Sequence, residues 1–202
     1  MNAVDPEITA DELEAHLSDA NTAKLLETVG MYAFAYEIVS STVADNVSGF
    51  FTTGLDEKGW TFDGEWDEVR SKHRHELAAC LDWLVDQDVL TEEEAASVDA
   101  LRKERNRYAH NFTEILANPR AGFEIELLVK ARLVLKKVAV FFGGIQADTG
   151  TALGSAEGEV DYEGIESGAS LLYAHALRVW AGIPQETVDR THAEAADTKP
   201  RT

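Results

Sequence analysis

Cysteines, basic residues and long uncharged apolar runs are all scarce in this chain. Cys80 is the single cysteine among 202 residues, which excludes an intramolecular disulfide and a metal cage built from cysteines. Only 18 Lys and Arg face 37 Asp and Glu, and the resulting formal charge of −19 repels nucleic acid at long range. The longest apolar stretch, 127–145, contains several Lys and Arg residues, which argues against a membrane span.

The remaining composition is that of a folded, soluble protein. Hydrophobic residues make up 45% of the chain and charged residues 27%, as in ordinary globular domains. The first residues are acidic and lack the basic-then-apolar order of a signal peptide. The sequence therefore predicts a cytoplasmic protein without a membrane partner.

Hydrophobic periodicity predicts a helical fold. Two capping boxes mark helix starts, one at Thr9 with Glu12 and one at Thr91 with Glu94. The apolar spacing predicts helices over residues 9–16, 22–47, 65–85, 92–108, 122–142 and 169–181. Strands alternating with helices are not indicated, so the expected fold class is all-α, a bundle of four to five main helices.

Glycine-rich stretches suggest how the chain is divided. Residues 48–64 predict a loop or a loose hairpin, and residues 143–168 predict a mobile extension. We therefore expect three parts: a helical domain over 1–142 with its core at 22–142, an extension with one helix packed on the bundle over 143–183, and a disordered tail over 184–202.

The residues richest in chemistry are 101–110, LRKERNRYAH. Arg105 falls on the apolar stripe of its helix, where a permanent charge is costly unless it has a partner or a function. Histidine moves a proton near neutral pH, and arginine presents a planar set of donors to phosphate oxygens. His110, Arg105 and Asn106 therefore suit RNA cleavage without a metal or cofactor, with the ribose 2′-hydroxyl as nucleophile.

The spacing of Arg105 and His110 does not bring them together on one regular helix. Five residues advance an α-helix by about 500°, so the two side chains point about 140° apart and lie about 7.5 Å apart along the axis. They converge only if the helix unwinds near Ala109 or if a second copy supplies half of the site.

Residues 105–110 resemble the R-x(4–6)-H motif of HEPN-domain proteins and match its frequent RN-x-x-A/V-H form. The helix arrangement around the motif is similar too, so the resemblance covers about residues 22–142. It implies an α-helical, usually dimeric domain, and active members of the family are metal-independent ribonucleases. Many of these are toxins or effectors of defence against phage.

Carried over residue by residue, the resemblance implies that Arg105 and His110 are catalytic and that Asn106 is their polar companion. RNA is then the substrate, a homodimer is expected, and a protein partner neutralises or regulates the activity. One branch of the family carries a tyrosine two residues after the histidine, which a partner nucleotidyltransferase modifies. This chain has Phe112 there, so that form of neutralisation is not implied.

Candidate substrate-binding cations are Arg102, Lys103, Arg107 and Arg74. Arg74 belongs to a second basic run, 70–75, that would extend an RNA track. In that run His73 lies on the apolar stripe of the helix predicted over 65–85, which favours a histidine buried in the core. His73 and His75 are two residues apart and face different sides of a helix, so no metal pair is expected there.

Non-catalytic interpretations remain open at this point. Arg105 could bond the last carbonyls of its helix or pair with an acid of a neighbouring element, and cations near a helix C-terminus stabilise the helix dipole without any other function. The protein would then be a non-catalytic helical module that binds a partner protein, a nucleotide or RNA. Tyr32 and Tyr36 suit a core stripe better than base stacking.

Overall fold

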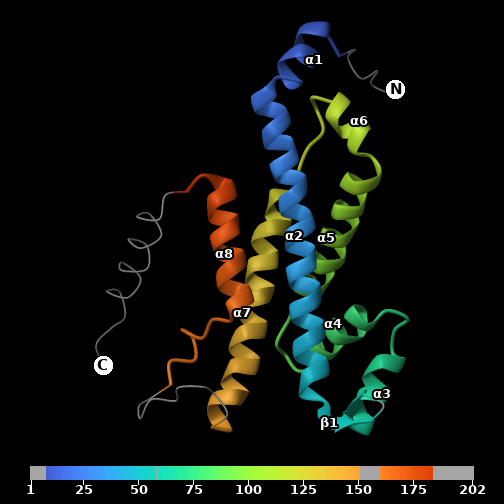
Figure 1. Cartoon of the computed structure of the whole chain (residues 1–202), viewed down its shortest axis with the longest axis vertical. Coiled ribbons are helices and arrows are strands. Elements are labelled where there is room, and N and C mark those ends of the chain that lie inside the picture. Colours follow the sequence, from blue (N-terminus) through green and yellow to red (C-terminus); the bar gives the residue numbers. More distant parts are fainter. Residues whose placement is uncertain (1–7, 58, 151–159, 184–202) are drawn as a thin grey trace.

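The described part of the protein is a packed bundle of eight helices with one two-stranded hairpin (Figure 1). The structure is a computed structural model and describes residues 8–57, 59–150 and 160–183. Its elements, in chain order, are α1 (Ala10–His16), α2 (Asp19–Phe50), β1 (Thr52–Asp56), β2 (Gly59–Phe62), α3 (Gly64–Ser71), α4 (Glu76–Asp86), α5 (Glu92–His110), α6 (Phe112–Ala117), α7 (Ile125–Asp148) and α8 (Gly168–Ala181). The predicted helical bundle is confirmed, and the predicted loose hairpin is a paired one.

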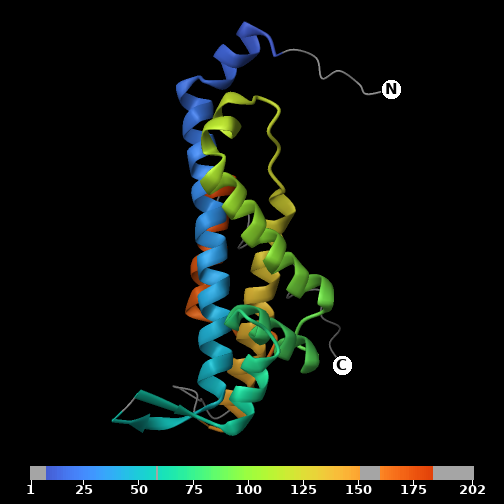
Figure 2. The same ribbon diagram turned by 90° about the vertical axis from the view of Figure 1, so that its right-hand side faces the viewer.

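The helices α2 and α7 form the centre of the bundle. Both contact α5 on one side and α8 on the other, so α5 and α8 lie on opposite sides of this pair (Figures 1 and 2). The hairpin projects from the end of the bundle where α2 and α7 terminate (Figure 2). The end of α5 and the short α6 lie near the other end of the bundle.

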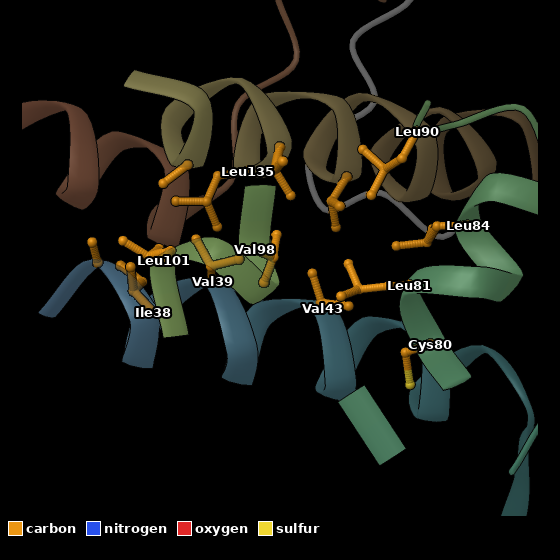
Figure 3. Packing of buried hydrophobic residues seen from close by; sticks show 14 of the residues in the cluster. Ile38, Val39, Val43, Cys80, Leu81, Leu84, Leu90, Val98, Leu101 and Leu135 are labelled. Carbon is orange, nitrogen blue, oxygen red and sulfur yellow. The ribbon is translucent and has the colours of Figure 1, made fainter. Parts of the chain in front are cut away.

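The core lies between α2, α4, α5 and α7. Val39 and Val43 of α2 point toward Leu135 of α7, with Val98 of α5 and Leu84 of α4 closing the sides (Figure 3). All five side chains are buried. Because these positions recur at helical spacing, the same pattern that predicted the helices also selects the faces that pack.

Both predicted capping boxes are formed. The Thr9 hydroxyl accepts a hydrogen bond from the Glu12 amide at 3.2 Å, and the Glu12 carboxylate accepts from the Thr9 amide at 2.9 Å. Thr91 and Glu94 repeat this at 3.2 and 2.8 Å. These caps satisfy amides that a helix start leaves without a partner, and thereby fix where α1 and α5 begin.

The single helix predicted over 65–85 is wrong, because the chain forms α3 and α4 with a link at residues 72–75. Lys72 in this link binds Asp86 at 2.6 Å, and His73 binds Asp82, both on α4. The His73 side chain is 38% exposed, so the predicted buried core histidine is also wrong. In the turned chain, residues 72 and 73 thus contact acids of α4, which a continuous helix would not allow for both.

The predicted end of the α7 helix at 142 is wrong, since α7 continues through Gly143 and Gly144 to Asp148. A Cβ on Gly143 would lie 2.5 Å from Cγ2 of Ile165, and one on Gly144 would lie 3.5 Å from the Tyr162 ring. Gly143 therefore allows the segment before α8 to cross α7 closely, whereas a Cβ on Gly144 would make an ordinary contact, and neither glycine ends the helix. Residues 151–159 of the expected mobile extension, and the expected tail over 184–202, lie outside the described residues.

The predicted last helix packs back on the bundle as α8. Tyr173 is fully buried and donates a hydrogen bond to the Leu128 carbonyl of α7 at 2.8 Å. Lys24 of α2 donates to the Trp180 carbonyl at 2.7 Å. None of the helices in the described ranges is long and apolar enough to cross a membrane.

Candidate functional site at the C-terminal end of α5

The basic run of the sequence forms the C-terminal half of α5. This helix stays regular through Ala109 and ends at His110, and α6 begins after Asn111. Local unwinding, one of the two routes by which Arg105 and His110 could converge, is therefore not observed. Helix geometry keeps their side chains on different sides of α5 within one chain.

Arg102 and Lys103 share one acidic partner on the same helix. Asp99 binds Arg102 at 2.7 Å and Lys103 at 2.8 Å. The Lys103 and Arg102 hydrogen bonds lower the pKa of Asp99 below its ordinary value. Exposed pairs of this kind contribute only about 0–1 kcal/mol to stability, so an external anion can compete for both cations.

Arg107 has a structural role. It donates to the Glu104 carboxylate at 2.7 Å, to the Tyr108 hydroxyl at 3.0 Å and to the Gly122 carbonyl at 3.1 Å. Burial would raise the pKa of Glu104, but the hydrogen bonds from Arg107 and Tyr108 outweigh it and lower that pKa. Arg107 is thus neutralised within the chain and ties α5 to the loop before α7.

Arg105 differs from its neighbours in having an aromatic partner. Its guanidinium carbon lies 4.5 Å from the centre of the Tyr36 ring on α2, a distance typical of a cation–π contact. Within the described residues it forms no ion pair, and the positions one helical turn away on α5 carry no carboxylate. Arg105 therefore keeps its hydrogen-bonding capacity and its charge for an external anion.

His110 and Asn106 complete the motif without fixed partners. His110 is exposed as the last residue of α5, and Asn106 is half-buried one turn before it. Neither side chain hydrogen-bonds to another residue within 8–57, 59–150 or 160–183. Both are therefore accessible to a ligand, but the chain does not by itself orient the imidazole.

Three rings behind the motif fix α5 on α2. Tyr32 of α2 lies 4.8 Å from Tyr108, Phe123 lies 5.0 Å from Tyr108, and Tyr32 and Phe123 are 6.2 Å apart, so the three rings contact one another. Burial is the main cause that raises the pKa of Tyr32 to about 12. The predicted core role of Tyr32 is confirmed, whereas Tyr36 is only half-buried and its contact with Arg105 was not foreseen. Tyr36 and Arg105 each lie on the apolar stripe of their own helix, and this was the feature of the sequence from which their contact could have been predicted.

Arg74 is not brought together with the motif. It is exposed in the link between α3 and α4, which lies toward the hairpin end of the bundle, far along it from the junction of α5 and α6 (Figure 1). The structure therefore places the two basic runs of the sequence at separate locations. A continuous RNA track through both would have to follow the length of the bundle.

Other features bear on alternative chemistries. A group of three or more His, Cys, Asp or Glu side chains placed to hold a metal ion does not occur among the described residues. Burial raises the pKa of the Cys80 thiol to about 12, which makes it a poor nucleophile. Two surface hollows, of about 510 and 650 Å³, share Trp180 of α8 as a wall and open between α8 and α2.

Comparison with known proteins adds no relative. The likeness to HEPN-domain proteins therefore depends on the motif residues and on the helix order alone. No protein-family model, no curated protein and no solved structure matches this chain.

Proposed function

We propose that this protein is a metal-independent endoribonuclease of the HEPN type that acts as a homodimer. The observation that carries the proposal is the state of Arg105. It is the motif cation that lacks an acidic partner in the described structure, and it lies over Tyr36 with its donors unused. On a chain with a charge of −19, leaving this arginine unneutralised favours a role in binding an anion.

In the proposed mechanism Arg105 and His110 divide the chemistry of phosphodiester cleavage. His110 takes the proton of the ribose 2′-hydroxyl or gives one to the leaving oxygen, and Arg105 stabilises the charge that develops on the phosphate. The bond between phosphorus and the 5′-oxygen breaks as the 2′-oxygen attacks. The products are a 2′,3′-cyclic phosphate and a 5′-hydroxyl, and Asn106 bonds the phosphate or orients the ring.

The unbroken α5 favours a site shared by two copies. Because one chain directs Arg105 and His110 to different sides of its helix, a two-fold dimer would combine Arg105 of one protomer with the partner's His110. A narrow cationic cleft between two copies would agree with a protein whose charge of −19 repels nucleic acid at long range. Arg102 and Lys103 would exchange Asp99 for RNA phosphates at its rim.

The test is RNA cleavage by the purified protein in EDTA, with the chemistry of the 3′ end determined. His110→Ala and Arg105→Ala should each reduce the cleavage rate by about 10²- to 10⁴-fold, while His75→Ala, another exposed histidine, should not. Cyclic-phosphate ends that disappear in both motif variants would support the mechanism. Intact RNA across structured and unstructured substrates would overturn it.

A second candidate is a non-catalytic helical module that binds a partner protein, a nucleotide or RNA. The two hollows beside Trp180 favour it, since concave apolar surfaces are typical of ligand sites. Overexpression separates the candidates in the cell. A nuclease that acts as a toxin stops growth and is rescued by His110→Ala, whereas a binding module tolerates that change.

A further inference from the structure

The β-hairpin is the element that extends furthest from the bundle core (Figure 2). Its strands β1 and β2 pair antiparallel, with Leu55 opposite Trp60. A two-stranded sheet with no third strand is marginally stable in water, and it leaves one edge of each strand without a backbone partner. The hairpin must therefore be stabilised by its attachment to the bundle, by a partner, or by both.

The two faces of the hairpin differ in chemistry. A register shift between Thr52 and Gly54 places Thr53 on the face of Thr61, and the two hydroxyls hydrogen-bond at 3.2 Å. Leu55 and Trp60 lie side by side on the opposite face, because directly paired residues of an antiparallel ribbon share a face. The β-bulge thus keeps one face polar and the other apolar.

The base of the hairpin is held firmly by aromatic packing. Phe62 stacks on Trp66 of α3 at 5.9 Å, and Trp66 stacks on Phe51 at 5.6 Å. The Asp63 amide also donates to the Phe51 carbonyl at 2.8 Å. The apolar face therefore begins at the buried core and continues outward along the hairpin.

Beyond that base the apolar face is open to solvent. The Leu55 side chain is 68% exposed and Trp60 is 67% exposed. A mostly exposed tryptophan forgoes much of the stabilisation that burial would give, and Trp is among the residues most enriched at the centres of protein interfaces. A firmly attached, two-faced ribbon with an uncovered Leu–Trp pair has the properties of a docking element.

The charges around this face indicate what covers it. Residues 52–65 contain four acids, Asp56, Glu57, Asp63 and Glu65, and one cation, Lys58, so the hairpin and its base carry a net negative charge. These acids repel a second copy, an anionic membrane surface and nucleic acid alike. They attract a protein whose apolar pocket carries lysine or arginine at its rim.

We propose that the Leu55–Trp60 face of the hairpin docks into a basic-rimmed apolar pocket of a partner protein. This inference is independent of the proposed nuclease activity. The hairpin lies at the opposite end of the bundle from the α5–α6 junction, so a partner bound there leaves Arg105 and His110 uncovered (Figure 2).

A library of displayed random peptides, selected on the full chain and counter-selected on Trp60→Ser, supplies a defined probe. We expect hairpin-dependent binders in which apolar residues are combined with Lys or Arg. Their Kd should rise at least about tenfold in Leu55→Ser and in Trp60→Ser, and stay unchanged in Thr61→Ser on the polar face. Added salt should weaken binding, because the rim contacts are ionic.

Several outcomes would overturn the proposal. Enriched peptides that are acidic or uncharged would contradict the charge argument, and the absence of hairpin-dependent binders would contradict docking. In sedimentation, a dimer lost in Trp60→Ser would show that a second copy covers the face. Trp60-dependent binding to vesicles of phosphatidylcholine, with or without phosphatidylserine, would point to a membrane instead. Since Trp60 is exposed, Trp60→Ser should melt like the wild type, so lost binding would not reflect unfolding.

Discussion

The two ends of the bundle differ in how far partly buried charged groups take part in their packing. Near the α5–α6 junction, the hydrogen bond from Arg107 to the Gly122 carbonyl and the ring contacts of Tyr108 with Tyr32 and Phe123 connect the elements. At the hairpin end, stacked rings such as Phe51, Trp66 and Trp83 do so. Charge interactions depend on pH and salt, whereas ring packing depends on volume and shape. The first end is therefore suited to binding an ion, and the second to holding a protruding element.

The largest effect of a single substitution on stability is expected at Trp83, in the ring packing of the hairpin end. This residue of α4 is 9% exposed and contacts four rings: Phe50 at the end of α2, Phe51 directly after it, and Phe141 and Phe142 of α7. Trp83→Ala should lower the free energy of unfolding by about 3–5 kcal/mol through the cavity it leaves. Urea unfolding followed by circular dichroism measures this.

Trp60→Ala is the matched control for Trp83→Ala, since the two tryptophans lie at the same end of the molecule. Because Trp60 is 67% exposed, its replacement should change stability by less than about 0.5 kcal/mol. Equal losses for the two variants would show that the hairpin tip packs on the bundle in solution, which would also remove the basis for a docking face.

At the motif end, Glu104→Gln should lower stability at pH 7 by about 1–3 kcal/mol, because it leaves the partly buried Arg107 without its carboxylate. The folded pKa of Glu104 is lowered, so its contribution is complete above the unfolded pKa and is lost as pH falls through the folded pKa. The gap between wild type and variant should therefore close in acid.

Asp99→Asn, on the same helix, is the control for Glu104→Gln. Asp99 also binds two cations, but its side chain is 46% exposed, so the loss should stay below about 1 kcal/mol. The comparison is made by thermal unfolding from pH 7 down to pH 3. If the Glu104→Gln gap persisted in acid, Glu104 would act through packing and not through its charge.

Local signals predicted the helices well where one element determines its own ends. The capping boxes at Thr9 and Thr91 did so, because a cap depends on residues three positions apart. The break at 72–75 was missed because the apolar stripe has the same spacing on both sides of it, whereas the contacts of Lys72 and His73 with acids of α4 exist only once the chain has turned. When two consecutive helices have the same apolar spacing, the sequence pattern does not show that the chain changes direction between them.

The candidate site was predictable in composition but not in geometry. Residue spacing placed Arg105 on the apolar stripe of its helix, and the structure adds Tyr36, a residue distant in sequence, as the contact of this half-buried side chain. It also shows that Arg107 is used internally, through Gly122 in a loop that the sequence did not describe. The carboxylates that bind Arg102, Lys103 and Arg107 lie three or four residues away on α5, so helix spacing could have predicted these pairs. The contacts to Tyr36 and Gly122 join different elements, and helical periodicity contains no information on these.

The smallest effect concerns two helical glycines, one toward each end of the bundle. Gly30 in α2 has open space where a Cβ would lie, so Gly30→Ala should stabilise the protein by about 0.5–1 kcal/mol through helix propensity alone. Gly143 in α7 would place its Cβ 2.5 Å from Ile165, and Gly143→Ala should destabilise by about 1 kcal/mol despite the same gain in propensity. Opposite signs of the change in Tm would show that Gly143 is present for close packing. A stabilising Gly143→Ala would instead mean that residues 160–166 do not hold Ile165 against α7, and that the predicted flexible boundary after Phe142 was nearer to the truth.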